Sequence, residues 1–129
     1  MATERLISRH SLDNGLILEM WDRSRPVAGD RCQVVLETRI GIPITTDTLP
    51  TDLRGRRSEI VQALGPQIVF SQARERNFIS ASVAPALLKE MEAQILDVTR
   101  KYFSHPDFPG RYIRKKFAEY LAKPRRSGR

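Results

Sequence analysis

Residues 6–21 read LISRHSLDNGLILEMW and determine the first element of the fold. Two apolar-rich runs flank Asp13-Asn14-Gly15, and Asn and Gly tolerate the positive φ angles that a two-residue type I′ turn requires. Alternate residues of the second run share one apolar face: Leu16, Leu18 and Met20. The stretch therefore predicts a β-hairpin with Asn14-Gly15 at its tip.

The next segment predicts a third strand. Residues 25–30 contain proline and glycine and read as a turn, and residues 32–42 then alternate between apolar and polar side chains until Pro43. Consecutive strands with short connections usually pair with each other. We therefore expect an antiparallel meander of three strands.

The rest of the chain predicts one more strand and three helices. A short helix is expected over about 57–64, where Gly65-Pro66 provides a strong stop signal. Further elements are expected as a strand over 67–78 and helices over 82–103 and 110–122. The long helix has Ser82 as its expected N-cap, and its apolar stripe at helical spacing extends to Val98 and Tyr102.

These elements predict an α+β fold. The expected order is strand, strand, strand, helix, strand, helix, helix, with an antiparallel four-stranded sheet and helices packed on one face. Residues 1–122 are expected to form a single domain, and residues 123–129 a flexible basic tail.

Composition narrows the possible classes of protein. Of 129 residues, 40% are hydrophobic, enough to fill a core at this length. Cys32 is the only cysteine, so neither an internal disulfide nor a zinc site of several cysteines is possible, and we expect it to be a small buried apolar residue. Nothing indicates a cofactor or a metal. The chain has no signal-peptide pattern and no run of about 20 apolar residues, so we expect it in the cytoplasm.

The positive charge is concentrated at the end of the chain. Residues 105–129 hold eight basic and two acidic side chains, a net charge of 8 − 2 = +6. Residues 1–104 hold 14 basic and 13 acidic side chains, a net charge of +1. This pattern predicts contact with nucleic acid or another polyanion. The expected contacts are Arg111, Arg114, Lys115, Lys123, Arg125 and Arg126. The alternative is a solvated helix face followed by a frayed end.

A second basic cluster lies at the start of the short helix. Arg54, Arg56 and Arg57 form a candidate anion site there, because free backbone N–H groups point outward at a helix N-terminus. Arg74 and Arg76 can join it only if the fold brings them close. No phosphate-binding glycine motif is present, and the alternative is a charged loop partly neutralised by its neighbours: Asp52 and Glu59.

The exposed side of the predicted sheet carries Ile17, Trp21 and Val35. Left uncovered, they would form an apolar contact for another protein or for a second copy in a homodimer; alternatively, the last helix covers them. We therefore expect a non-enzymatic binding module that contacts a polyanion or a protein. The alternative is a small enzyme whose carboxylate or arginine site the sequence does not reveal, and no catalytic residue stands out.

Overall fold

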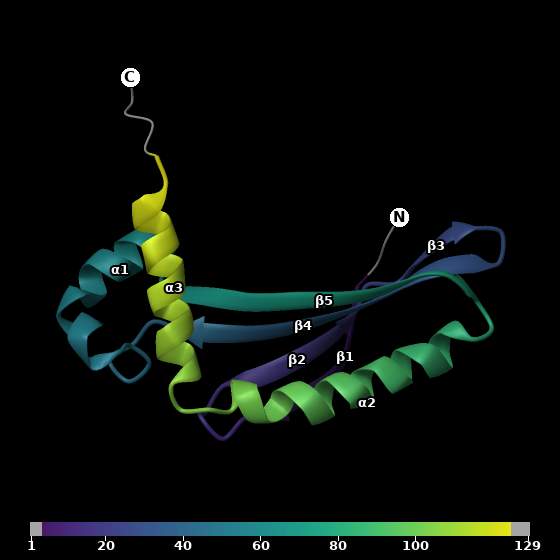
Figure 1. Ribbon diagram of the computed structural model, residues 1–129, viewed down its shortest axis with the longest axis horizontal. Helices are drawn as coiled ribbons and strands as arrows, with labels where there is room; N and C mark the ends of the chain where they lie inside the picture. Colours follow the sequence, from purple (N-terminus) through teal and green to yellow (C-terminus); the bar gives the residue numbers. More distant parts are fainter. Residues whose placement is uncertain (1–3, 125–129) are drawn as a thin grey trace. The chain divides into compact units, whose positions relative to one another are not determined.

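The computed structural model describes residues 4–124 (Figure 1). Its elements, in chain order, are β1 (Arg5–Ser11), β2 (Ile17–Asp22), β3 (Arg25–Ala28), β4 (Arg31–Pro43), the 3₁₀ helix η1 (Thr51–Arg56), α1 (Arg57–Leu64), β5 (Gln67–Ser80), α2 (Ala84–Phe103) and α3 (Phe108–Ala122). The described chain packs as two compact units. The first unit comprises residues 4–41 and 69–105, and the second unit comprises residues 42–68 and 106–124. The domain boundary at residue 122 stays a prediction, and residues 125–129 of the predicted tail lie outside the described residues.

The predicted α+β class with an antiparallel sheet is confirmed, but the sheet has five strands rather than four. The strand order is β1-β2-β4-β3, and β5 pairs with β4. β3 is the strand that the sequence analysis missed: Pro26 lies opposite Cys32 of β4, so most of the predicted 25–30 turn is a short hairpin arm. Proline is tolerated there because β3 is an edge strand that needs few ladder hydrogen bonds.

The first hairpin forms as predicted, with a different turn. The Gly15 N–H donates to the Leu12 carbonyl, the Leu12 N–H donates to the Leu16 carbonyl, and only Gly15 in this loop has a positive φ, 88°. These bonds define a three-residue loop, a type I turn followed by glycine, rather than the expected two-residue type I′ turn. The Asn14 amide instead donates to the carbonyls of Phe103 (2.7 Å) and His105 (3.0 Å) at the end of α2.

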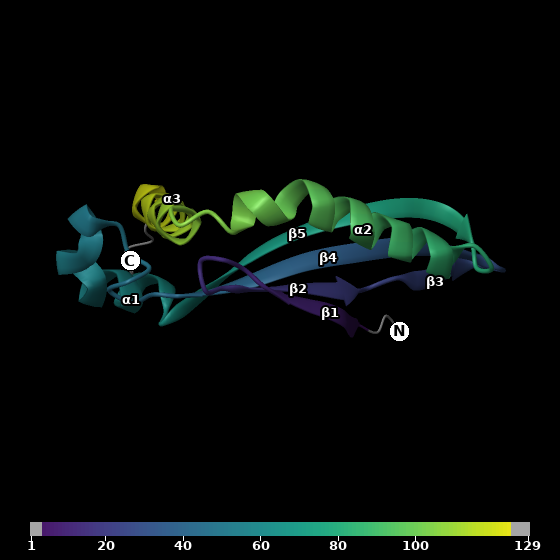
Figure 2. The ribbon, with the colours of Figure 1, turned by 90° about the horizontal axis from the view of Figure 1, so that it is seen from below.

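The core of the first unit lies between the sheet and α2, which runs along one face of the sheet (Figure 2). The alternation of β2 and β4 directs their apolar residues to this inner face, where they are fully buried: Leu18, Met20, Val34, Leu36 and Ile40. α1 and α3 belong to the second unit.

The long helix ends at Phe103 as predicted, but its start and the burial of its last turns differ from the prediction. α2 begins at Ala84 with no side-chain cap, and the Ser82 hydroxyl pairs with Ser80 instead. Leu88, Met91 and Ile95 of the predicted stripe are buried. Val98 and Tyr102, however, are 74% and 61% exposed, so the stripe leaves the core in its last turns.

The second unit has its own small core. The Thr48 hydroxyl donates to the Pro43 carbonyl (2.6 Å), which folds the chain after β4 into a tight turn leading to η1. Gly65 ends α1 with a φ of 90°, and its N–H donates to the Val61 carbonyl, as the stop signal predicted. α1 and α3 contribute Ile60, Phe108, Ile113 and Phe117 to this core, and the segment before α1 contributes Ile42, Ile44, Leu49 and Leu53.

Candidate functional site

The second unit contains a polar cleft of about 390 Å³. The 45–50 turn and η1 form one wall, and the start of α3 forms the other. Gly110 lets α3 approach this closely, because a Cβ there would lie 3.2 Å from a side-chain carbon of Pro50. The cleft brings Arg54, from the predicted helix-start cluster, together with Arg111 and Arg114, from the predicted polyanion surface.

Arg114, which lines this cleft, forms a fork with Asp52. The two guanidinium nitrogens donate to the two carboxylate oxygens at 2.6 and 3.1 Å. These hydrogen bonds hold the pKa of Asp52 below its ordinary value, so the side chain stays ionised at neutral pH. Arg111 is paired more loosely with Asp107, at 3.6 Å. Both ion pairs are half-exposed, and such pairs are individually weak.

The remaining basic residues of α3 differ in their pairing. Lys116 binds Glu119 at 3.1 Å, and this hydrogen bond raises the pKa of Lys116. Lys115 and Lys123 are exposed and have no carboxylate partner among the residues that the structure describes. Arg125 and Arg126 of the predicted surface lie outside the described residues.

Two arginines of the predicted helix-start site have structural contacts. Arg56 forms a double hydrogen bond with Glu59 (2.8 and 2.9 Å) and lies over the Phe117 ring at 5.0 Å. The hydrogen bonds raise the pKa of Arg56 and lower that of Glu59. Arg57 donates to the Ile44 carbonyl at 3.3 Å. Arg54, in contrast, is exposed toward the cleft.

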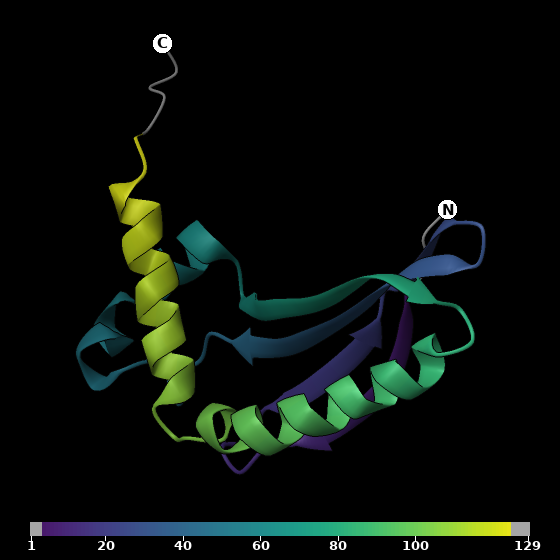
Figure 3. The ribbon, with the colours of Figure 1, turned by 45° about the vertical axis from the view of Figure 1, so that its right-hand side comes forward.

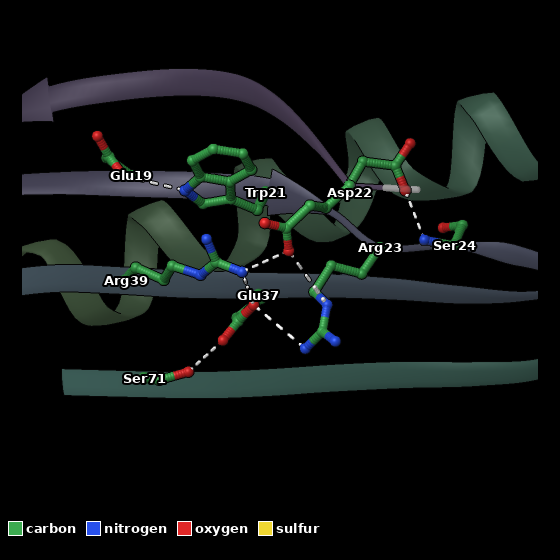
Figure 4. A network of polar contacts seen from close by, with 9 residues as sticks. Glu19, Trp21, Asp22, Arg23, Ser24, Glu37, Arg39 and Ser71 are labelled. Atoms are coloured by element: carbon green, nitrogen blue, oxygen red, sulfur yellow. Dashed lines mark hydrogen bonds and ion pairs between the residues drawn. The ribbon is translucent and has the colours of Figure 1, made fainter. Parts of the chain in front are cut away.

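On the outer face of the sheet, polar side chains surround Trp21 of the predicted protein contact (Figure 4). Ile17 is 41% exposed, whereas Val35 is only 8% exposed. Trp21 is half-buried: its indole N–H donates to Glu19 (3.0 Å), and the Arg39 guanidinium covers its ring at 4.5 Å.

Glu37 is the centre of this polar cluster. Its carboxylate accepts hydrogen bonds from Arg39 (2.8 Å), Arg23 (3.4 Å) and the Ser71 hydroxyl of β5. Burial raises the pKa of Glu37, but the hydrogen bonds from Arg39 and Ser71 outweigh burial, so the pKa lies below its ordinary value. Glu4 pairs with both arginines as well, so two carboxylates balance two guanidinium groups. The sequence analysis missed this cluster, although strand alternation places all its β4 members on one face.

Comparison of the chain with protein-family models, with curated proteins and with solved structures finds no match. Within residues 4–124, no group of three or more His, Cys, Asp or Glu side chains is arranged to hold a metal ion. No helix in that part of the chain is long and apolar enough to cross a membrane. Cys32 is half-buried, and its sulfur lies 3.4 Å from the Ile79 carbonyl.

Proposed function

We propose that this protein is a non-enzymatic module that binds a polyanion on its second unit. One observation carries the proposal: the excess charge belongs to this unit and exceeds what its carboxylates can neutralise. Residues 42–68 and 106–124 hold eight basic and five acidic side chains, 8 − 5 = +3, and Arg125, Arg126 and Arg129 raise the total to +6. The first unit holds eleven basic and ten acidic side chains, 11 − 10 = +1.

The chemistry of the cleft favours phosphate groups. Arg54, Arg111 and Arg114 supply planar guanidinium groups, which match phosphate oxygens in pairs. Thr48 and Thr51 line the same cleft, together with the carboxylates of Asp47 and Asp107. The exposed ion pairs of Arg111 and Arg114 do not prevent this, because ion pairs in solvent are weak and a phosphate can replace the carboxylate. Lys115 and Lys123 extend the cationic surface along α3.

Two other functions receive less support. A protein or homodimer contact through the outer sheet face would have to use Ile17 beside a charge-balanced cluster, since Val35 is buried. For the alternative of a small enzyme, the one buried carboxylate among the described residues is Glu37, and both of its oxygens already accept hydrogen bonds. We place the module in the cytoplasm, where a lone thiol such as Cys32 is usual.

Fluorescence anisotropy with a labelled 20-base-pair DNA tests this proposal. If about six phosphates are neutralised, the logarithm of the affinity should fall with the logarithm of salt concentration with a slope of about −5. The variant Lys115→Glu/Lys123→Glu should weaken binding at least about 10-fold and make the slope shallower by about two.

The control variant is Lys89→Glu/Lys101→Glu, which makes the same change in net charge on α2 of the first unit. It should retain most of the affinity. Equal losses for both variants would show attraction to net charge alone, and no binding at low salt would remove the proposal.

A further inference from the structure

β5 is a long edge strand of the sheet. It has 14 residues, and within the described chain it pairs only with β4, so the other side of its backbone has no strand partner (Figure 3). Residues 71–78 are all exposed. Such edges accept further strands, and proteins usually shorten, cover or break them. β5 is not short and contains no proline.

A groove of about 260 Å³ lies between β5 and α2. Met91, Ile95 and Val98 of α2 form its apolar wall, and Arg74 and Arg76 of β5 form the other. Val98 is 74% exposed, although it belongs to the apolar stripe of α2. The exposed apolar surface of Val98 is therefore part of the groove wall.

The groove is cationic as well as apolar. No carboxylate lines it, and Arg74 has no hydrogen-bond or ion-pair partner among the described residues. Within residues 4–124, Arg76 donates only to the carbonyl of its neighbour Glu75, at 2.9 Å. The Glu75 carboxylate itself accepts a hydrogen bond from Gln33 at 3.2 Å. The two guanidinium groups are thus available to an anionic ligand.

These charges argue against a second copy of the chain on the same edge. Antiparallel pairing of two β5 strands about Glu75 would place Arg74 of one copy opposite Arg76 of the other, and like charges that face each other are destabilising. An occupant with carboxylates at these positions would instead gain two ion pairs. Charge complementarity therefore selects an acidic segment of another protein.

We propose that β5 and the groove bind an extended acidic segment of a partner protein as a sixth strand. Side chains alternate along a strand, so the partner residues opposite Arg74 and Arg76 are two apart and point toward α2. The recognised pattern is thus two carboxylates at i and i+2, with an apolar residue next on the same face to cover Val98. Backbone hydrogen bonds supply affinity, and the alternating side chains supply selectivity.

A symmetric peptide tests this site without assuming a strand direction. The probe is acetyl-Val-Thr-Glu-Thr-Glu-Thr-Val-amide, titrated into the full chain and followed by amide NMR. Binding should shift the β5 amides of residues 71–78 and slow their hydrogen exchange. Arg74→Glu/Arg76→Glu should weaken binding about 2- to 30-fold, the loss expected for two exposed ion pairs.

A charge swap provides the decisive control. The same peptide with lysine in place of glutamate should bind the Arg74→Glu/Arg76→Glu variant better than it binds the wild type, which also shows that the variant is folded. The Lys89→Glu/Lys101→Glu variant, with an equal charge change elsewhere in the first unit, should bind the acidic peptide as the wild type does. Absence of binding, binding unaffected by the arginine changes, or shifts in α2 without protection of β5 would each overturn the proposal.

Discussion

Glu37 is a nearly buried carboxylate that accepts hydrogen bonds from Arg23, Arg39 and Ser71. It lies on β4, while Arg23 follows β2 and Ser71 belongs to β5, so one side chain links three neighbouring segments of the sheet. The same cluster positions Arg39 over Trp21. The Glu37 carboxylate thus holds side chains of three segments together on the outer face of the sheet.

Glu37→Gln should lower the free energy of unfolding at pH 7 by about 1–3 kcal/mol, because charge-assisted hydrogen bonds are replaced by weaker ones. The folded pKa of Glu37 lies below its ordinary value of 4.5. Its contribution is therefore complete above pH about 4.5 and is lost as the pH falls through the lowered folded pKa. The difference in the free energy of unfolding between the wild type and the variant should thus become smaller at acid pH.

Urea unfolding between pH 3 and pH 7 measures this effect. Glu90→Gln is the matched control, because Glu90 is exposed on α2. If the difference in unfolding free energy between the wild type and Glu37→Gln stayed constant across this pH range, the assigned role of the Glu37 charge would be contradicted.

Asp52 is the carboxylate that pairs with Arg114 of the proposed polyanion site. Asp52→Asn removes one negative charge and releases Arg114 from its fork. DNA affinity should rise about 3-fold near 0.1 M salt, and the salt slope should steepen by about one.

Asp97→Asn, on the exposed face of α2, is the control for the Asp52 change, and anisotropy measures both. If Asp97→Asn raised the affinity as much as Asp52→Asn, Arg114 would not be a contact.

At the scale of elements, the Asn14 side chain joins the first hairpin to the end of α2. Its amide donates to two carbonyls, Phe103 and His105, while its Oδ1 accepts from the Leu16 N–H at 3.2 Å. The last carbonyls of a helix have no partner within the helix, so this contact acts as a C-terminal cap from another segment.

Asn14→Ala should therefore destabilise the protein by about 1–2 kcal/mol and increase hydrogen exchange in the last turn of α2. Asp13→Ala, one position earlier in the same exposed loop, should change the stability by less than about 0.5 kcal/mol. Unfolding curves and exchange rates for the two variants check the assignment, which fails if they behave alike.

Local patterns predicted the long elements well. Period-2 alternation located β2 and β4, and Gly65-Pro66 located the end of α1. The errors arose where contacts between residues far apart in the sequence determine the local structure. Asn14, in the loop before Gly15, contacts the end of α2. β3 forms by pairing with β4. Val98 fitted a core stripe by spacing alone, but burial depends on how far the sheet extends beneath the helix.

For the molecule as a whole, charge follows the division into units. The sequence showed that the excess lies late in the chain, but not that residues 42–68 join it in one compact unit. The cleft that combines Arg54 with Arg111 and Arg114 could not be predicted, because those residues are far apart in sequence. The pairing of Arg114 with Asp52 likewise could not be predicted from the sequence.

The most direct test of this account is an amide NMR titration of the full chain with the 20-base-pair DNA at low salt. We predict that the shifted resonances fall within 42–68 and 106–124, centre on Arg54, Arg111 and Lys115, and return toward the free positions as salt is added. Shifts centred on the first unit, or a spectrum unchanged at saturating DNA, would contradict the assignment of polyanion binding to the second unit.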